Sequence, residues 1–159
     1  RLLGTMATND GATIPPTEMI HLSYEGNFEL ECDAKVVGYQ VVEDNDQKRA
    51  ELQLDRTAMH PQGGGQPTDL GQIRFPSGTI LDIKKVTMDR ESGVVTHAGV
   101  VMADGDDSDG VETGVEVHVS VDGANRQILS ECHTAGHVVD SAMARCDRIL
   151  PPTKGYHFL

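Results

Sequence analysis

The chain has 159 residues, of which 38% are hydrophobic, enough for the core of one domain or of one domain and part of a second. Its formal net charge of −12 argues against a broad phosphate-binding face, because nucleic-acid-binding proteins usually carry a basic one. The 3 cysteines have no paired spacing, and no run approaches the roughly 18 apolar residues of a membrane span. We therefore expect a soluble cytoplasmic protein without a disulfide framework and without membrane contact.

The first two thirds of the chain are predicted to form strands after a leader. Residues 1–20 show no periodicity and contain Pro15-Pro16, so we expect a loose leader there. Apolar and polar residues then alternate over 28–36, which is the period of a half-buried strand. Further strand candidates, separated by turn residues, lie at 39–42, 50–54, 72–75, 79–86, 94–101 and 115–121. Their number and spacing predict a small antiparallel β-barrel, closed or nearly closed, over residues 21–121.

The period changes at Asp122, a residue suited to cap the N-terminus of a helix. Apolar residues recur at helical spacing from there, which predicts a helix over about 123–147. Pro151-Pro152 cannot continue that helix. The apolar face of the helix has no partner in the few residues left, so we expect 122–159 to be the start of a second, α/β domain that is truncated in this chain.

Two histidines on the predicted helix are the first candidates for chemistry. His133 and His137 stand four residues apart, which places both imidazoles on one face of a helix. Zinc binds histidine nitrogen, and a catalytic zinc has three protein ligands and one open position. The spacing by itself fits equally well two ordinary helix histidines, one packed and one solvated.

A glycine-rich segment is the second candidate. Gly63, Gly64 and Gly65 permit positive φ and let the backbone approach a ligand closely. The segment has no Lys-Ser/Thr, so it is not a nucleotide-binding P-loop. Three neighbouring side chains offer polar groups that suit a small polar ligand: Thr57, Gln66 and Asp69. The alternative is a flexible turn between two strands.

Taken together, these segments resemble the editing domain of alanyl-tRNA synthetases and the free-standing AlaX trans-editing proteins. The first motif comprises Leu54-Asp55-Arg56-Thr57, Pro61-Gln62-Gly63-Gly64-Gly65-Gln66-Pro67 and Asp69-Leu70-Gly71. The second comprises Val121-Asp122, Arg126 and His133-Thr134-Ala135-Gly136-His137-Val138-Val139, similar to the family's HTAxHLL-type metal helix. With the weaker match at Lys154-Gly155-Tyr156-His157-Phe158, the resemblance spans roughly residues 28–159.

The resemblance implies an α+β protein in which the barrel precedes the start of an α/β editing domain that carries the metal helix. It implies a deacylase that hydrolyses Ser or Gly from the alanine tRNA, contacts the acceptor end of that tRNA, and holds zinc through His133 and His137. Thr57 would recognise the seryl hydroxyl, and Gln66 would line the same pocket. Asp69 would orient the loop or the substrate amine, and a loop-capping role fits it equally well. These residues flank the loop of Gly63, Gly64 and Gly65. Candidates for phosphate contact are Lys84, Lys85, Arg90, Arg126, Arg145 and Arg148, with a role in surface solubility as the alternative for each.

The chain also departs from the family's pattern. His60 stands where an aromatic residue, commonly Tyr, is usual, and Gly136 replaces a usual Thr. The Cys-x-x-x-His pair that completes the family's zinc site is absent. Three alternatives therefore stay open: a non-catalytic tRNA-binding or assembly module, the excised editing region of a synthetase, and the related second domain of threonyl-tRNA synthetase, against which the glycine-rich loop argues. The sequence predicts no oligomeric state.

Overall fold

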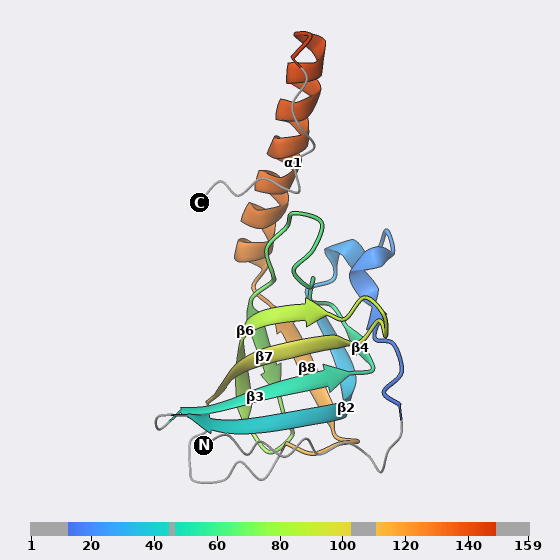
Figure 1. The fold of residues 1–159 in the computed structure, drawn as a ribbon. Coiled ribbons are helices and arrows are strands. Elements are labelled where there is room, and N and C mark those ends of the chain that lie inside the picture. The colour runs from blue at the N-terminus through green and yellow to red at the C-terminus, as the bar shows by residue number, and fades with distance from the viewer. Residues whose placement is uncertain (1–12, 45–46, 103–110, 149–159) are drawn as a thin grey trace.

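Figure 1 shows a β-barrel from which one long helix emerges in a computed structural model of the chain. The structure describes residues 13–44, 47–102 and 111–148. No helix within these ranges has the length and apolarity to span a membrane. The remaining residues, which include the predicted 154–158 segment, lie outside the described ranges.

Six antiparallel strands close the barrel in the order β2-β3-β7-β6-β5-β8. They are β2 (Glu31–Asp44), β3 (Gln47–Leu54), β5 (Gly71–Arg74), β6 (Ile80–Met88), β7 (Val95–Met102) and β8 (Glu116–Val121). β8 closes the ring because it pairs on one side with β2 and on the other with β5. The prediction of an α+β chain with a closed antiparallel barrel is confirmed. The predicted strands 28–36 and 39–42 correspond to the single strand β2, and residues 28–30 precede it.

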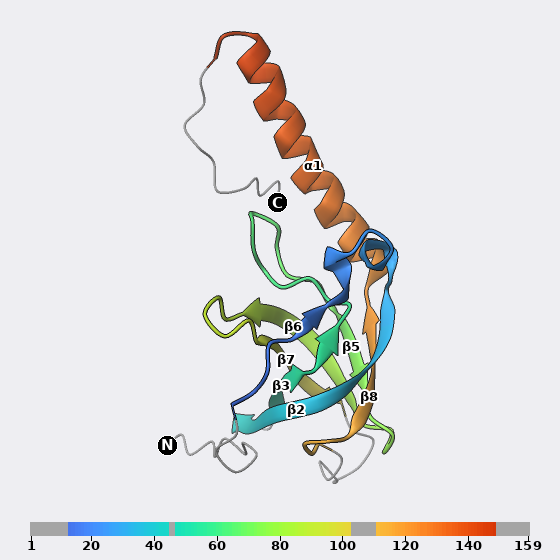
Figure 2. The same cartoon turned by 90° about the vertical axis from the view of Figure 1, so that its right-hand side faces the viewer.

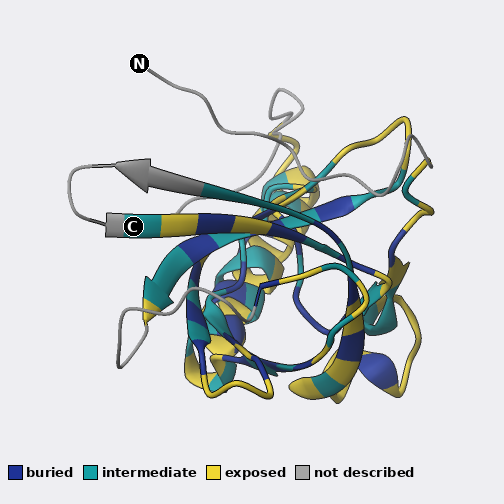
Figure 3. Ribbon diagram, turned by 90° about the horizontal axis from the view of Figure 1, so that it is seen from below, coloured by how far each residue is buried: buried dark blue, intermediate teal, exposed yellow. Residues whose placement is uncertain are grey.

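The barrel interior is the hydrophobic core. Figure 3, which looks along the barrel, shows buried and more exposed residues alternating along its strands. Inward positions carry Val, Leu and Ile, for example Val36, Leu52 and Ile83, all with 0% exposure. Outward positions between them are polar or partly exposed, so the period of two seen in the sequence corresponds to the two faces of the barrel wall. Burial of these aliphatic side chains is the main stabilising contribution to the fold.

The N-terminal segment packs against the barrel. β1 (Glu18–Met19) pairs in parallel with β4 (Arg56–Thr57), and the Thr17 hydroxyl donates to the Leu54 carbonyl at 2.9 Å. Two short 3-10 helices follow, η1 (Ile20–Leu22) and η2 (Gly26–Phe28). The expectation of a loose leader is therefore wrong for residues 17–20, because pairing with a strand far along the chain cannot be read from local periodicity.

Helix α1 (Gly123–Arg145) begins directly after β8 and points away from the barrel, as Figures 1 and 2 both show. Near its start, Arg126 and Leu129 are buried, whereas Ile128 and Val138 are 55% and 62% exposed. The predicted helix is thus present. The prediction that its apolar face belongs to a further α/β domain stays a prediction.

The start of α1 offers a test of the cap. The Asp122 carboxylate accepts a hydrogen bond from the Asn125 backbone N–H at 3.0 Å. Asp122→Ala leaves this N–H without its partner, and we expect the free energy of unfolding to fall by about 1 kcal/mol in urea denaturation. Asp122→Asn keeps an acceptor oxygen and is the control, expected to lie within about 0.5 kcal/mol of the wild type. Equal losses in both variants would contradict the capping role.

Candidate functional site

A buried ion pair joins the glycine-rich segment to helix α1. Asp69 is completely buried and Arg126 is 9% exposed. The Arg126 Nε donates to Asp69 Oδ2 at 3.0 Å, its Nη2 donates to the same oxygen, and the His60 backbone N–H is a third donor at 2.6 Å. Arg126 also donates to the carbonyls of Ala58 and Glu29. The two sequence motifs, 57 residues apart at this pair, are thus held together by one charge-assisted network.

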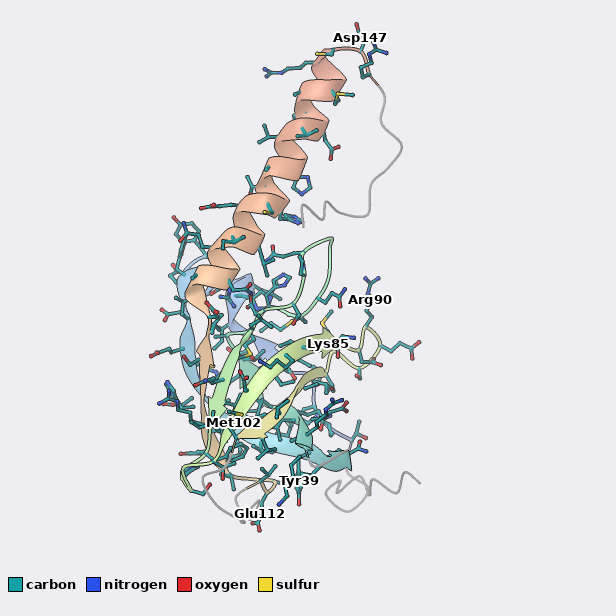
Figure 4. The ribbon with its side chains drawn as sticks, turned by 90° about the vertical axis from the view of Figure 1, so that its left-hand side faces the viewer. Tyr39, Lys85, Arg90, Met102, Glu112 and Asp147 are labelled. Carbon is teal, nitrogen blue, oxygen red and sulfur yellow. The ribbon has the colours of Figure 1, made fainter. Side chains whose placement is uncertain are left out.

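The same geometry corrects one expectation. Arg126 was predicted as a phosphate contact, but its guanidinium is buried and bonded on all three nitrogens, so it is not free to meet tRNA. Of the others, Lys84, Lys85 and Arg90 are exposed on β6 and the turn after it, while Arg145 and Arg148 are exposed at the far end of α1. Figure 4 shows this separation, with Lys85 and Arg90 on the barrel and Asp147 at the distal end of the helix. These cations therefore form no single patch.

The glycine-rich loop is a tight turn. The Gly63 and Gln66 backbones exchange two hydrogen bonds, at 3.1 and 2.9 Å, across Gly64 and Gly65. Gly64 and Gly65 have φ of +59° and +89°, in the left-handed region that favours glycine. Thr68 anchors the end of the loop, because its hydroxyl accepts the Val86 N–H at 2.6 Å. The side chain of Gln66 is partly exposed.

Thr57, on β4, is fully buried, with 0% exposure. Its hydroxyl oxygen is 2.9 Å from Nε2 of His97 on β7 and accepts the Met59 backbone N–H at 3.1 Å. His97 is also fully buried, and its Nδ1 is 3.3 Å from the Leu52 carbonyl oxygen. Sequence reasoning overlooked His97, although a histidine at an inward position of a predicted strand marks a buried polar group that needs partners.

The burial of His97 predicts a pH dependence of stability. Burial lowers the pKa of His97 to about 4, from 6.5 when the ring is exposed. Between these values the unfolded chain binds a proton that the folded chain does not, so stability falls as the pH is lowered from 6.5 towards 4. We expect a slope of up to about 1.4 kcal/mol per pH unit from this group, measured by urea denaturation across that range. The slope should decrease in His97→Gln, and an unchanged slope would contradict the assignment.

His21 and His60 form a second group of imidazoles that sequence reasoning did not bring together. Their ring centroids are 4.9 Å apart, since the pairing of β1 with β4 places η1 beside the loop. Burial lowers the pKa of His21 to about 4 and also lowers that of His60, with Arg126 adding to both effects and Asp69 opposing them. Three buried atoms here have no hydrogen-bond partner within the described part of the chain: Nδ1 of His21, Nδ1 of His60 and Oδ1 of Asp69. Because the pKa of each ring is lowered from 6.5, both rings are neutral near pH 7.

The helix histidines face each other. Nε2 of His133 and Nε2 of His137 are 3.0 Å apart, close to the roughly 3.3 Å that separates two nitrogens bound to one tetrahedral zinc. His133 lies near enough to His60 to contribute to the lowering of its pKa, after burial and Arg126. Across the described ranges, no three His, Cys, Asp or Glu side chains are grouped so as to hold a metal ion. The pair thus fits as two ligands of an incomplete set.

No protein-family model matches this sequence. Curated relatives include the alanine–tRNA ligase of Methanopyrus kandleri, 37% identical over 135 residues that cover 83% of this chain and 13% of the ligase. That of Methanothermobacter thermautotrophicus is 33% identical over 142 residues, or 84% and 14% of the two chains. That of Korarchaeum cryptofilum is 30% identical over 131 residues, or 82% and 12%. The chain therefore spans only about one eighth of the length of these relatives.

Proposed function

We propose that this chain, which belongs with the alanine–tRNA ligases as the homologue of one segment of them, is a deacylase that acts in trans on the alanine tRNA charged with Ser or Gly. The reaction is the attack of water on the ester carbonyl, which releases the free amino acid and the tRNA 3′ hydroxyl. A synthetase pocket sized for alanine rejects glycine and serine poorly, so a separate hydrolytic site is the chemical remedy.

One observation carries this proposal: the Asp69–Arg126 pair holds the glycine-rich loop against the start of the helix that bears His133 and His137. The two motifs would be of no joint use if they were far apart. Asp69 Oδ2 takes three donors, two from Arg126 and one from the His60 N–H, and its carboxylate is completely buried. We therefore assign Asp69 to positioning the loop.

His133 and His137 are the residues that would hold zinc, through the two Nε2 atoms that face each other. Bound zinc supplies a water molecule of lowered pKa, or an anchor for the aminoacyl group. The remaining ligands would have to come from outside the described residues, from solvent or from the substrate.

Thr57 is proposed to meet the seryl hydroxyl, with Gln66 on the neighbouring glycine-rich turn. Because Thr57 is fully buried in the free protein, this contact requires the segment after it to move. Gly63, Gly64 and Gly65 lower the resistance of the backbone to such a movement. A hydroxyl-binding site discriminates against alanine, which lacks the hydroxyl, since the buried polar group then stays unpaired. Release of Gly does not follow from this contact.

A second function is favoured by one specific observation. The described residues contain no group of three metal-binding side chains around the His133–His137 pair, as expected of a non-catalytic tRNA-binding or assembly module. Deacylation assays on alanine tRNA charged with Ser, Gly or Ala separate the two, with zinc content measured on the same sample. Release of Ser or Gly with Ala spared supports the deacylase. A folded, zinc-loaded sample that binds tRNA without releasing Ser or Gly overturns it and leaves the binding module.

A further inference from the structure

The hydrogen bonds of His97 determine which of its nitrogens carries the proton. Nδ1 is 3.3 Å from the Leu52 carbonyl oxygen, which can only accept, so Nδ1 bears the hydrogen. The pKa of His97 is lowered by burial to about 4, and the ring is therefore neutral near pH 7 with one N–H. Nε2 consequently has a free lone pair and must act as an acceptor.

This tautomer determines the polarity of the Thr57 hydroxyl. A hydroxyl has one hydrogen and two acceptor positions. The hydrogen is donated to Nε2 of His97 at 2.9 Å, and one acceptor position receives the Met59 backbone N–H at 3.1 Å. One acceptor position is left, so any third partner of Thr57 must be a hydrogen-bond donor.

We propose that His97 is a positioning residue that presents Thr57 to the substrate as an acceptor only, and thereby makes the site prefer the seryl group to the alanyl group. Release of Gly, which has no side chain to donate a hydrogen bond, does not depend on this contact. A seryl hydroxyl donates such a bond, whereas the alanyl methyl group cannot. The inference rests on the proposed function, in which Thr57 meets the seryl side chain. It adds that His97 makes the Thr57 hydroxyl the acceptor, and the seryl hydroxyl the donor, of that hydrogen bond.

The tautomer can be measured directly on the unmodified protein. Nitrogen-15 NMR of the histidine rings at pH 7, with His97→Gln used to assign the signal, is expected to show a protonated Nδ1 and a bare Nε2 for His97. A protonated Nε2 would mean that Thr57 is the acceptor in this pair, and the proposal would be wrong. The tautomer is read from the wild-type protein, and the His97→Gln variant serves only to assign the signal. The measurement therefore does not depend on enzymatic activity.

A double-mutant cycle tests the consequence for selectivity. His97→Leu removes the acceptor, and we expect the ratio of kcat/KM for Ser-tRNA to that for Ala-tRNA to fall about tenfold or more. His97→Gln can place an amide oxygen near the former Nε2 and is expected to retain most of the ratio. In a Thr57→Val background, His97→Leu should change the ratio less than about twofold, because its effect passes through Thr57.

The outcomes are distinguishable. An equal loss on both substrates in His97→Leu, or a fall in selectivity that persists beside Thr57→Val, would show a merely structural role and overturn the inference while the deacylase stands. If wild-type protein releases no Ser, the proposed function fails, and the NMR result still decides the orientation of Thr57. Far-ultraviolet circular dichroism of every variant identifies those that do not fold, for which the NMR result alone decides.

Discussion

Replacing His133 with alanine is expected to lower zinc affinity by roughly 100-fold or more and to abolish release of Ser from the alanine tRNA. The Nε2 atoms of His133 and His137 are 3.0 Å apart and are the two nitrogens proposed to hold zinc; a single imidazole would not retain the ion against solvent. Zinc affinity is measured by competition with a chromogenic chelator, and deacylation is measured on the same preparation.

The matched control for this prediction is His118→Ala. His118 is a partly exposed histidine on β8 that bonds to Asp33, so its removal changes the histidine count without touching the helix pair. It should leave zinc affinity and deacylation unchanged. Zinc bound by His133→Ala as tightly as by the wild type would show that the helix pair is not the metal site.

Replacing Arg126 with methionine is expected to lower the free energy of unfolding by about 3–5 kcal/mol. The Asp69 carboxylate would remain completely buried with one backbone donor and without its counter-ion, and burying an unpaired charge is costly. Urea denaturation measures the loss. The start of α1 would also lose its bonds to Ala58 and Glu29, so the helix would be held less firmly against the loop.

Two further variants separate the ion pair from general effects of the substitution. Arg145→Met changes an exposed arginine on the same helix and should shift stability by less than about 0.5 kcal/mol. The double variant Asp69→Leu/Arg126→Met removes both charges and should be more stable than Arg126→Met alone. If the single and double variants are equally unstable, lost packing, and not the unpaired carboxylate, accounts for the effect.

The sequence by itself determined the barrel strands, helix α1 and the pattern of the two motifs, but not β1, β4 or the two 3-10 helices. Two signals in the sequence are local: the alternation of apolar and polar residues along strands such as β2 and β8, and the helical period after Asp122. Each depends only on which face of an element is buried. The i, i+4 geometry of His133 and His137 likewise follows from the helix alone. Asp122 as the helix cap could be predicted for the same reason, since its partner is three residues away.

Only the tertiary structure decided which distant groups meet. Arg126 reaches Asp69 across 57 residues, and His97 reaches Thr57 across 40, because closure of the barrel and the register of its strands bring these side chains into one place. The parallel pairing of β1 with β4 carries His21 onto His60. Such contacts depend on the whole set of strand pairings, and neither residue spacing nor periodicity specifies those pairings.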